Sequence, residues 1–168
     1  MPGRKAERTQ PTIKKYEKEK LVFVTCIRTT PEKLWEALTE SGFTQRYWLQ
    51  TRQVTEWKPG ASWRAVNLEG KAIISGEIIE IEPPKKLVFT WRNETNPEIK
   101  AEGHSRVTYS LEQQGSSVKL TILHEMDKPG SKLLQSVSGG WPLVLASLKS
   151  LIETGEPLLE TSKWVPCG

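Results

Sequence analysis

The hydrophobic and polar positions of this chain change their period along its length, and these changes mark successive elements. Residues 21–28 are rich in β-branched and aromatic side chains and predict a strand. Thr30 and Pro31 supply the N-cap and the first position of a short helix that ends near residues 41–42, and a second helical turn follows at residues 45–48. The period then becomes two, and the apolar runs between turn residues predict six further strands, at residues 51–57, 62–67, 71–82, 86–93, 104–113 and 117–125.

The last element is an amphipathic helix. Trp141, Leu145, Leu148 and Ile152 recur at spacings of four, three and four, which is the period of a helix with one buried face. Gly155 is then placed to end the helix. Since consecutive strands joined by short turns pair antiparallel, the order of elements predicts an α+β domain in which an antiparallel sheet wraps around this helix.

Two segments have a less regular pattern. Residues 93–103 are polar and contain Asn96-Pro97, which predicts a loop between two strands. Residues 131–137 are interpreted as an extra turn ahead of the last helix, in which case the pair Gly139-Gly140 and Pro142 would kink it.

Length and charge favour one domain with two tails. We expect the domain to span residues 20–155 of the 168, with a basic, flexible tail at 1–19 and a second tail at 156–168. The formal net charge is +4. Residues 1–20 hold seven basic and three acidic residues, so the folded part is neutral overall and does not predict specific nucleic-acid binding.

The sequence contains no apolar run near the ~18 residues of a transmembrane helix, so no membrane insertion is expected. The first residues lack the apolar region of a signal peptide, which predicts a cytoplasmic protein. Two cysteines are present, and we expect Cys26 in the core and Cys167 as an exposed thiol. Their spacing predicts no metal site, and no cofactor is expected.

Seven tryptophans, against three phenylalanines and three tyrosines, are the unusual feature of the composition. Strand alternation places Phe89 and Trp91 on one face of their strand, and Tyr109 on the inner face of another. One interpretation is that these rings fill the core, because large aromatics dominate core packing. The other is a cavity for water or a ligand, because several inward indole N–H groups need partners.

His124 is the histidine that strand alternation points into the interior, since it shares a face with Leu120 and Ile122. Three roles remain open: a core or cavity-edge histidine bonded to a neighbour, a polar contact to a ligand, or a general acid or base. The third role would need a partner such as Tyr109 or Glu77, although Glu77 is expected to face solvent. No nucleophile elbow, phosphate-binding loop or zinc-protease motif occurs, so the sequence carries no catalytic signature.

Short motifs between residues 21 and 154 resemble the bacterial START-like (SRPBCC) proteins. They lie at residues 31–38, 46–48, 57–60, 83–87, 105–108, 124–125 and 138–141. The chain looks most like the subfamily named after the C-terminal domain of the activator of the heat-shock-protein-90 ATPase. One departure is that Met126-Asp127 replaces the Gly-Phe that usually follows His-Glu, which we expect to reshape the cavity rim near His124.

The resemblance implies the helix-grip fold of the Bet v allergen and START-like proteins. In this fold a curved antiparallel sheet surrounds a long C-terminal helix, with two short helices after the first strand and a cavity between. The superfamily binds lipids, sterols, polyketides and other hydrophobic molecules, and some branches cyclise or dehydrate polyketides. A ligand cavity between sheet and helix is therefore the expectation for this chain.

We predict a protein that binds a small hydrophobic molecule of the lipid, polyketide or aromatic class, as a monomer or homodimer. The side chains expected to contact this ligand are Trp35, Trp48, Trp63, Trp91, Tyr109, His124, Trp141, Leu145 and Leu148. His124 is the one candidate for catalysis. Two alternatives stay open: a cavity enzyme of the polyketide cyclase or dehydratase type, and a protein-partner role as a chaperone co-factor or regulator.

Overall fold

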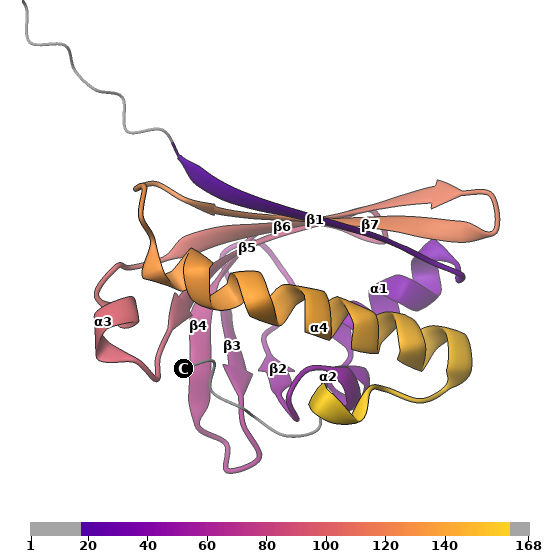
Figure 1. Cartoon of the computed structure of the whole chain (residues 1–168), viewed down its shortest axis with the longest axis horizontal. Coiled ribbons are helices and arrows are strands. Elements are labelled where there is room, and N and C mark those ends of the chain that lie inside the picture. The colour runs from indigo at the N-terminus through magenta and orange to yellow at the C-terminus, as the bar shows by residue number, and fades with distance from the viewer. Residues whose placement is uncertain (1–17, 162–168) are drawn as a thin grey trace, which may run out of the picture.

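A computed structural model describes residues 18–161 of the chain. A curved antiparallel sheet carries one long helix across one face, with short helices at its margins (Figure 1). This is the α+β architecture that the sequence predicts. The predictions for residues 1–17 and 162–168, Cys167 included, lie outside the described residues.

The sheet has seven strands in the order β1-β7-β6-β5-β4-β3-β2. The strands are β1 (Glu19–Ile27), β2 (Arg52–Val54), β3 (Ser62–Val66), β4 (Ala72–Glu82), β5 (Lys86–Asn93), β6 (Ser105–Gln114) and β7 (Ser117–Met126). Strands β2 to β7 follow one another as a meander, and β1 pairs with β7 in a register that puts Phe23 opposite Ile122. Strands β1 and β2 are therefore the two edges of the sheet.

The helices are α1 (Pro31–Thr39), α2 (Ser41–Tyr47), α3 (Pro97–Lys100), α4 (Lys132–Thr154) and a 3-10 turn, η1 (Leu159–Thr161). The N-cap predicted for α1 is confirmed, since Thr30 Oγ1 accepts a hydrogen bond from the Lys33 backbone N–H and Pro31 takes the first position. Turn η1 follows the predicted end of the domain and packs back on α4, where the hydroxyls of Ser147 and Thr161 are hydrogen-bonded.

Helix α4 is one continuous element of 23 residues, so the segment interpreted as an extra turn is its first part. Ser131 caps it by accepting from the Leu134 N–H, and Gly155, at φ 87°, ends it in the left-handed conformation. Pro142 lies inside the helix and has no N–H to donate to the carbonyl four residues earlier. Gly139 and Gly140 precede it, and beyond the adjacent residues and the local backbone of the helix no atom lies within 4 Å of the position a Cβ would take at either glycine.

Three predicted boundaries were wrong. The strand predicted at residues 51–57 is only β2, because the chain leaves the ladder after Val54 and Trp57 has a left-handed φ of 48°. The second helical segment begins earlier than predicted, at Ser41. The predicted loop at 93–103 contains the helical turn α3, because Asn96 accepts hydrogen bonds from two backbone N–H groups and Pro97 favours the first helical position.

The prediction that Cys26 lies in the core was also wrong. Cys26 is exposed, and it shares the outer face of β1 with Val22 and Val24, which are 55% and 54% exposed. Both faces of this strand are apolar in sequence, so alternation alone could not show which face is buried. At this end of β1, Lys149 Nζ donates to the Cys26 carbonyl at 2.7 Å, so a side chain of α4 covers part of the sheet edge.

The space between the sheet and α4 is largely filled by packed rings. Trp63 contacts Phe89 at a centroid distance of 4.7 Å, and Phe89 meets Tyr109 edge to face at 5.3 Å. The Trp63 indole N–H donates to Gln53 Oε1, and Gln53 Nε2 donates to the Leu38 carbonyl. The interior near β3 and β6 is therefore packed with rings, and a pocket opens toward the first half of α4.

Candidate ligand-binding site

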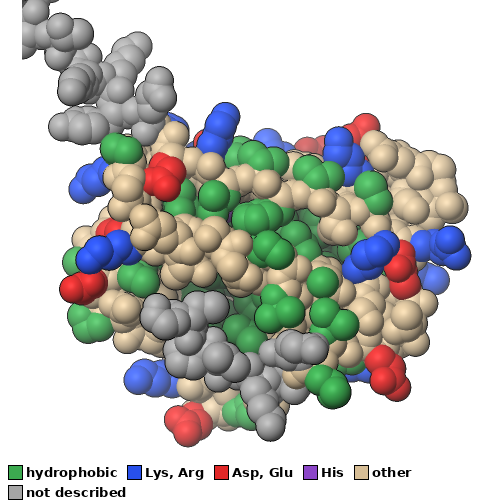
Figure 2. Space-filling model, in the orientation of Figure 1, with side chains coloured by type: hydrophobic (Ala, Val, Ile, Leu, Met, Phe, Trp, Pro, Cys, Tyr) green, Lys and Arg blue, Asp and Glu red, His purple; other side chains and the backbone are tan. Residues whose placement is uncertain are grey.

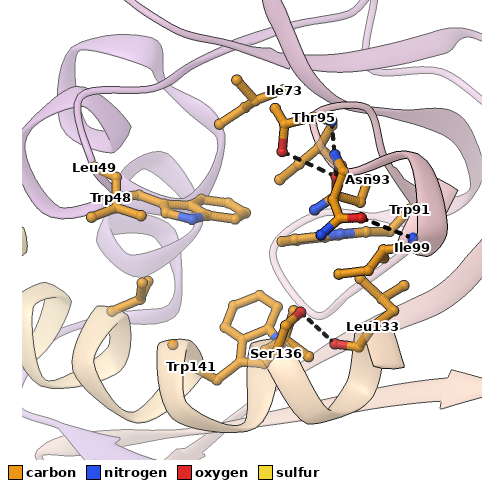
Figure 3. Close-up of a pocket in the computed structure, with 15 residues that line it drawn as sticks. Trp48, Leu49, Ile73, Trp91, Asn93, Thr95, Ile99, Leu133, Ser136 and Trp141 are labelled. Atoms are coloured by element: carbon orange, nitrogen blue, oxygen red, sulfur yellow. Dashed lines mark hydrogen bonds between the residues drawn. The ribbon is translucent and has the colours of Figure 1, made fainter. Parts of the chain in front are cut away.

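A pocket of about 380 Å³ opens between the first half of α4, the end of α2, strands β4 and β5, and helix α3 (Figure 3). Its walls are formed mainly by large apolar side chains, and the full lining is Trp48, Leu49, Ile73, Ile74, Trp91, Asn93, Thr95, Asn96, Ile99, Leu133, Ser136, Val137, Gly140, Trp141 and Val144. No charged side chain is part of this described lining. Figure 2 shows hydrophobic side chains gathered over the middle of the face that carries α4, with charged side chains around its margin. The pocket is thus suited to an apolar, uncharged guest.

Three tryptophans from different elements form one wall of the pocket. Trp48 follows α2, Trp91 lies on β5 and Trp141 on α4. Trp48 stacks on Trp91 with centroids 5.5 Å apart and planes at 26°, and Trp141 lies 5.7 Å from Trp48 and 5.6 Å from Trp91. Each is at most 6% exposed, so the three rings support one another in fixed positions and offer a preformed aromatic surface.

A buried hydrogen-bond chain behind this wall fixes two of the tryptophans. The Trp141 indole N–H donates to His124 Nδ1 at 3.1 Å, and His124 Nε2 lies 2.7 Å from Ser105 Oγ, which also bonds the Trp91 carbonyl at 3.0 Å. An indole nitrogen can only donate, so Nδ1 must accept and the proton of the neutral ring lies on Nε2. Ser105 then accepts from His124 and donates to the Trp91 carbonyl, so every hydrogen-bond donor in the chain is used within the protein.

The charge state of His124 follows from its burial. The side chain is fully buried, and this desolvation lowers its pKa from 6.5 to about 3. His124 is therefore neutral at physiological pH, in agreement with the donor and acceptor assignment above. Burial also raises the pKa of Tyr109 well above its ordinary value, with the nearby Tyr47 adding to the shift. The interior beside the pocket thus holds neutral polar groups.

The polar part of the rim comes from the segment between β5 and α3. Asn93 Oδ1 accepts from the backbone N–H groups of Thr95 and Asn96 and from the Thr95 hydroxyl. Asn96 Oδ1 accepts from the N–H groups of Glu98 and Ile99. Both amide oxygens therefore hold the turn together, and both amide NH₂ groups are left without a partner among the described residues.

An ion-pair cluster holds this rim against the sheet. Glu94 accepts from Arg92 Nε at 2.7 Å, pairs with Lys100 of α3 at 2.9 Å and is hydrogen-bonded by the Ser75 hydroxyl of β4. Burial alone would raise the pKa of Glu94, but the hydrogen bonds from Ser75, Lys100 and Arg92 outweigh it and lower the pKa from 4.5 to about 2. The carboxylate therefore stays charged and ties α3 to β4 and β5.

A second hollow, of about 370 Å³, adjoins the pocket and shares Leu49, Ile73 and Thr95 with it. Leu49 and Gln50 both have left-handed backbone angles, with φ 49° and 59°. Such conformations cost of order 1–3 kcal/mol each in residues with a side chain. The strained pair places the Leu49 side chain on the boundary between the two hollows.

Three of the nine predicted ligand contacts, Trp48, Trp91 and Trp141, lie together on the pocket wall. The other six do not line it: Trp35 is half-buried on α1, and Trp63, Tyr109, His124, Leu145 and Leu148 are buried in the core. Glu77 faces solvent as expected. The pocket therefore lies nearer to α3 than the predicted set of residues would place it.

The residues that sequence reasoning missed belong mostly to α3 and to the start of α4. Asn93, Asn96 and Ile99 lie in a segment predicted to be a loop, and Leu133 and Val137 lie before the predicted start of the helix. The Asn96-Pro97 pair carried a usable signal, because an Asn N-cap followed by Pro is typical of a helix start. No sequence signal indicated that this turn would meet α4.

The family model described as Activator of Hsp90 ATPase homolog 1-like protein matches residues 28–153. The chain belongs to this family. The START-like resemblance predicted from short motifs is thereby confirmed. No curated protein matches the sequence.

Solved structures agree on the fold. CalU16 from Micromonospora echinospora is 22% identical with a TM-score of 0.66, covering 84% of this chain and 78% of its own. The Aha1 dimer from Colwellia psychrerythraea is 16% identical with a TM-score of 0.66, covering 82% and 98%. An Hsp90 activator from Plasmodium falciparum is 22% identical with a TM-score of 0.63, covering 82% and 97%. At these identities the likeness shows the helix-grip fold alone.

Two further observations apply to residues 18–161. No helix there combines the length and apolar character needed to cross a membrane. Within the same residues, no group of three or more His, Cys, Asp or Glu side chains is arranged to hold a metal ion.

Proposed function

We propose that this protein binds a small hydrophobic molecule, of the aromatic, polyketide or acyl class, in the pocket beside α3. The observation that carries the proposal is the wall of three mutually packed tryptophans around a space of about 380 Å³. Burying apolar surface stabilises a complex by roughly 25 cal/mol per Å², and a rigid aromatic wall adds little ordering cost. We further propose a cytoplasmic location and a monomeric or homodimeric state.

The geometry does not favour the enzyme alternative. General acid or base catalysis by His124 requires a ring nitrogen within reach of the substrate. Both nitrogens of His124 are occupied, by Trp141 and Ser105, and the residue is not part of the pocket lining. We assign His124 the role of positioning Trp141 in the pocket wall.

Two glycines of α4 allow a direct test of the proposed function. Gly140 lines the pocket, whereas Gly139 does not, and both have open space where a side chain would begin. Gly140→Leu should place an isobutyl group in the pocket and weaken binding of the apolar probe fluorene at least ~10-fold, while Gly139→Leu should leave it within twofold. Equilibrium dialysis measures both affinities. Equal affinities in the two variants, or no fluorene binding by the unmodified protein, would overturn the proposal.

Native mass spectrometry of freshly purified protein adds an independent measurement. A mass excess that disappears on denaturation, and that is absent from the Gly140→Leu protein but present in Gly139→Leu, would support a bound ligand in this pocket. A mass excess retained by Gly140→Leu would place the bound molecule elsewhere.

A protein-partner role is the second candidate, and the outer face of β1 favours it. The side chains of Val22 and Val24 are more than half exposed on this face. Next to it, the Cys26 carbonyl and the Arg28 backbone N–H bond Lys149 and Glu153 of α4, so this end of the strand edge is covered. One structural neighbour is named as an Hsp90 activator. If this role applies, the chain should raise the ATPase rate of purified Hsp90, and a Val22→Lys, Val24→Lys variant should lose the effect.

A further inference from the structure

The polar groups on the pocket wall are amides, hydroxyls and indole N–H groups. Apart from the indole groups, the wall carries four polar side chains, those of Asn93, Thr95, Asn96 and Ser136. The Thr95 hydroxyl donates to Asn93 Oδ1, and the Ser136 hydroxyl donates to the Leu133 carbonyl. Their hydrogens are therefore used within the protein, so each hydroxyl can offer a ligand only an acceptor oxygen, and the two amides supply the donors of the rim.

Both amides are locked in one orientation. An Asn side chain can in principle turn either its oxygen or its NH₂ group toward a ligand. Here each oxygen accepts from two backbone N–H groups, so a flip would set NH₂ against N–H at four places. The NH₂ groups of Asn93 and Asn96 are thus the fixed outward ends, and Figure 3 shows the Asn93 side chain projecting to the pocket side.

The tryptophan wall adds indole N–H groups, which are also hydrogen-bond donors. The indole N–H groups of Trp63 and Trp141 are bonded within the core, but those of Trp48 and Trp91 donate to no described residue. In residues 18–161 the buried side-chain atoms without a partner are Thr29 Oγ1 and Thr55 Oγ1, so the nitrogens of Trp48 and Trp91 keep access to open space. An indole nitrogen cannot accept a hydrogen bond.

We propose that the amide and indole donors of the pocket select the ligand, and that this ligand is a neutral, planar or conjugated molecule bearing carbonyl-type acceptor oxygens. This inference rests on the proposed binding function and adds Asn93 and Asn96 as specificity-determining residues. A ketone, quinone or ester oxygen satisfies the amide and indole donors. A ligand with only an N–H or O–H donor leaves the amide and indole donors unpaired when water is excluded, and can pair only with the hydroxyl oxygens of Thr95 and Ser136. The absence of a charged side chain from the described lining favours a neutral carbonyl over a carboxylate.

Three tricyclic probes of nearly equal shape separate the possibilities. 9-Fluorenone carries an acceptor, carbazole carries only an N–H donor, and fluorene carries neither. Equilibrium dialysis against the full chain should give affinities in the order fluorenone, fluorene, carbazole, with fluorenone at least ~10-fold tighter than carbazole, since each satisfied or unsatisfied hydrogen bond changes affinity several-fold.

Asn93→Asp and Asn96→Asp test the two residues without removing their structural role. An Asp oxygen still accepts from the same backbone N–H groups, and at position 96 it still caps α3, but the outward group becomes an acceptor. Each variant should weaken fluorenone binding ~5-fold or more, leave the affinity for fluorene within twofold and tighten carbazole binding. Asn67→Asp is the matched control: Asn67 Oδ1 likewise accepts from two backbone N–H groups, those of Glu69 and Lys71, and Asn67 does not line this pocket.

The outcomes distinguish this inference from the proposed function. Carbazole binding as tightly as fluorenone, or fluorenone affinity unchanged in both Asp variants, would overturn selection by the amide donors. The pocket assignment would still stand if fluorene binding remained sensitive to Gly140→Leu. Failure of all three probes to bind would overturn both. A reversed preference for carbazole in the Asp variants would establish the inference, because a structural defect would weaken all three probes alike.

Discussion

At the scale of single residues, the most constrained group is the chain from Trp141 through His124 to Ser105. Ser105→Ala removes the hydroxyl that accepts from His124 Nε2–H and donates to the Trp91 carbonyl. Because both partners are buried and no water-exposed group replaces the hydroxyl, we expect the free energy of unfolding to fall by about 2 kcal/mol. Urea unfolding followed by fluorescence measures this change.

Ser138→Ala is the matched control for that substitution. The Ser138 hydroxyl also donates to a backbone carbonyl, that of Gln135, but it is exposed on α4. We expect a change below about 0.5 kcal/mol, since water replaces the lost partner at the surface. Equal effects of the two substitutions would mean that the buried chain adds no more than an exposed hydrogen bond.

At the scale of elements, the sequence predicted which segments are strands and helices better than how they meet. Residues 117–125 alternate clearly and form β7, and the buried face of α4 follows its spacing of three and four. The pocket depends instead on Asn93 and Asn96, whose amides come to face α4 only through tertiary packing. Similarly, both faces of β1 are apolar, so its periodicity could not tell that Cys26 would be exposed.

Strand β4 also contains a glycine whose role is tertiary. A Cβ at Gly76 would lie 1.9 Å from the backbone oxygen of Thr90 on β5, so Gly76→Ala must push two strands apart. We expect a loss of about 3 kcal/mol in the free energy of unfolding. Gly42→Ala in α2, where no atom lies within 4 Å, should instead be neutral or stabilise by up to about 1 kcal/mol. Thermal and urea unfolding compare the two, and a Gly76→Ala protein as stable as the parent would contradict the close approach.

At the scale of the whole molecule, the buried neutral histidine makes stability depend on pH in a defined window. The folded state keeps His124 unprotonated down to a pKa of about 3, whereas the unfolded chain binds the proton below about 6.5. The unfolded state therefore binds more protons throughout this range, and stability falls as the pH falls. Glu94 adds the same trend only below 4.5, where its carboxylate protonates in the unfolded chain but not in the folded one.

Between pH 6.5 and 4.5 the pH dependence of stability therefore reports the contribution of His124 without that of Glu94. We expect the free energy of unfolding to drop there by roughly 2 kcal/mol, approaching a slope of about 1.4 kcal/mol per pH unit. His124→Gln should flatten the profile in this interval, and His104→Gln should keep it, because the sequence holds two histidines and His104 is exposed. Urea unfolding at several pH values gives the profiles, and a steep profile retained by His124→Gln would show that the pH dependence has another source. Since His124 holds Trp141 in the pocket wall and stays neutral in the folded protein down to a pKa of about 3, the aromatic wall should keep its geometry across this interval even though the fold loses stability.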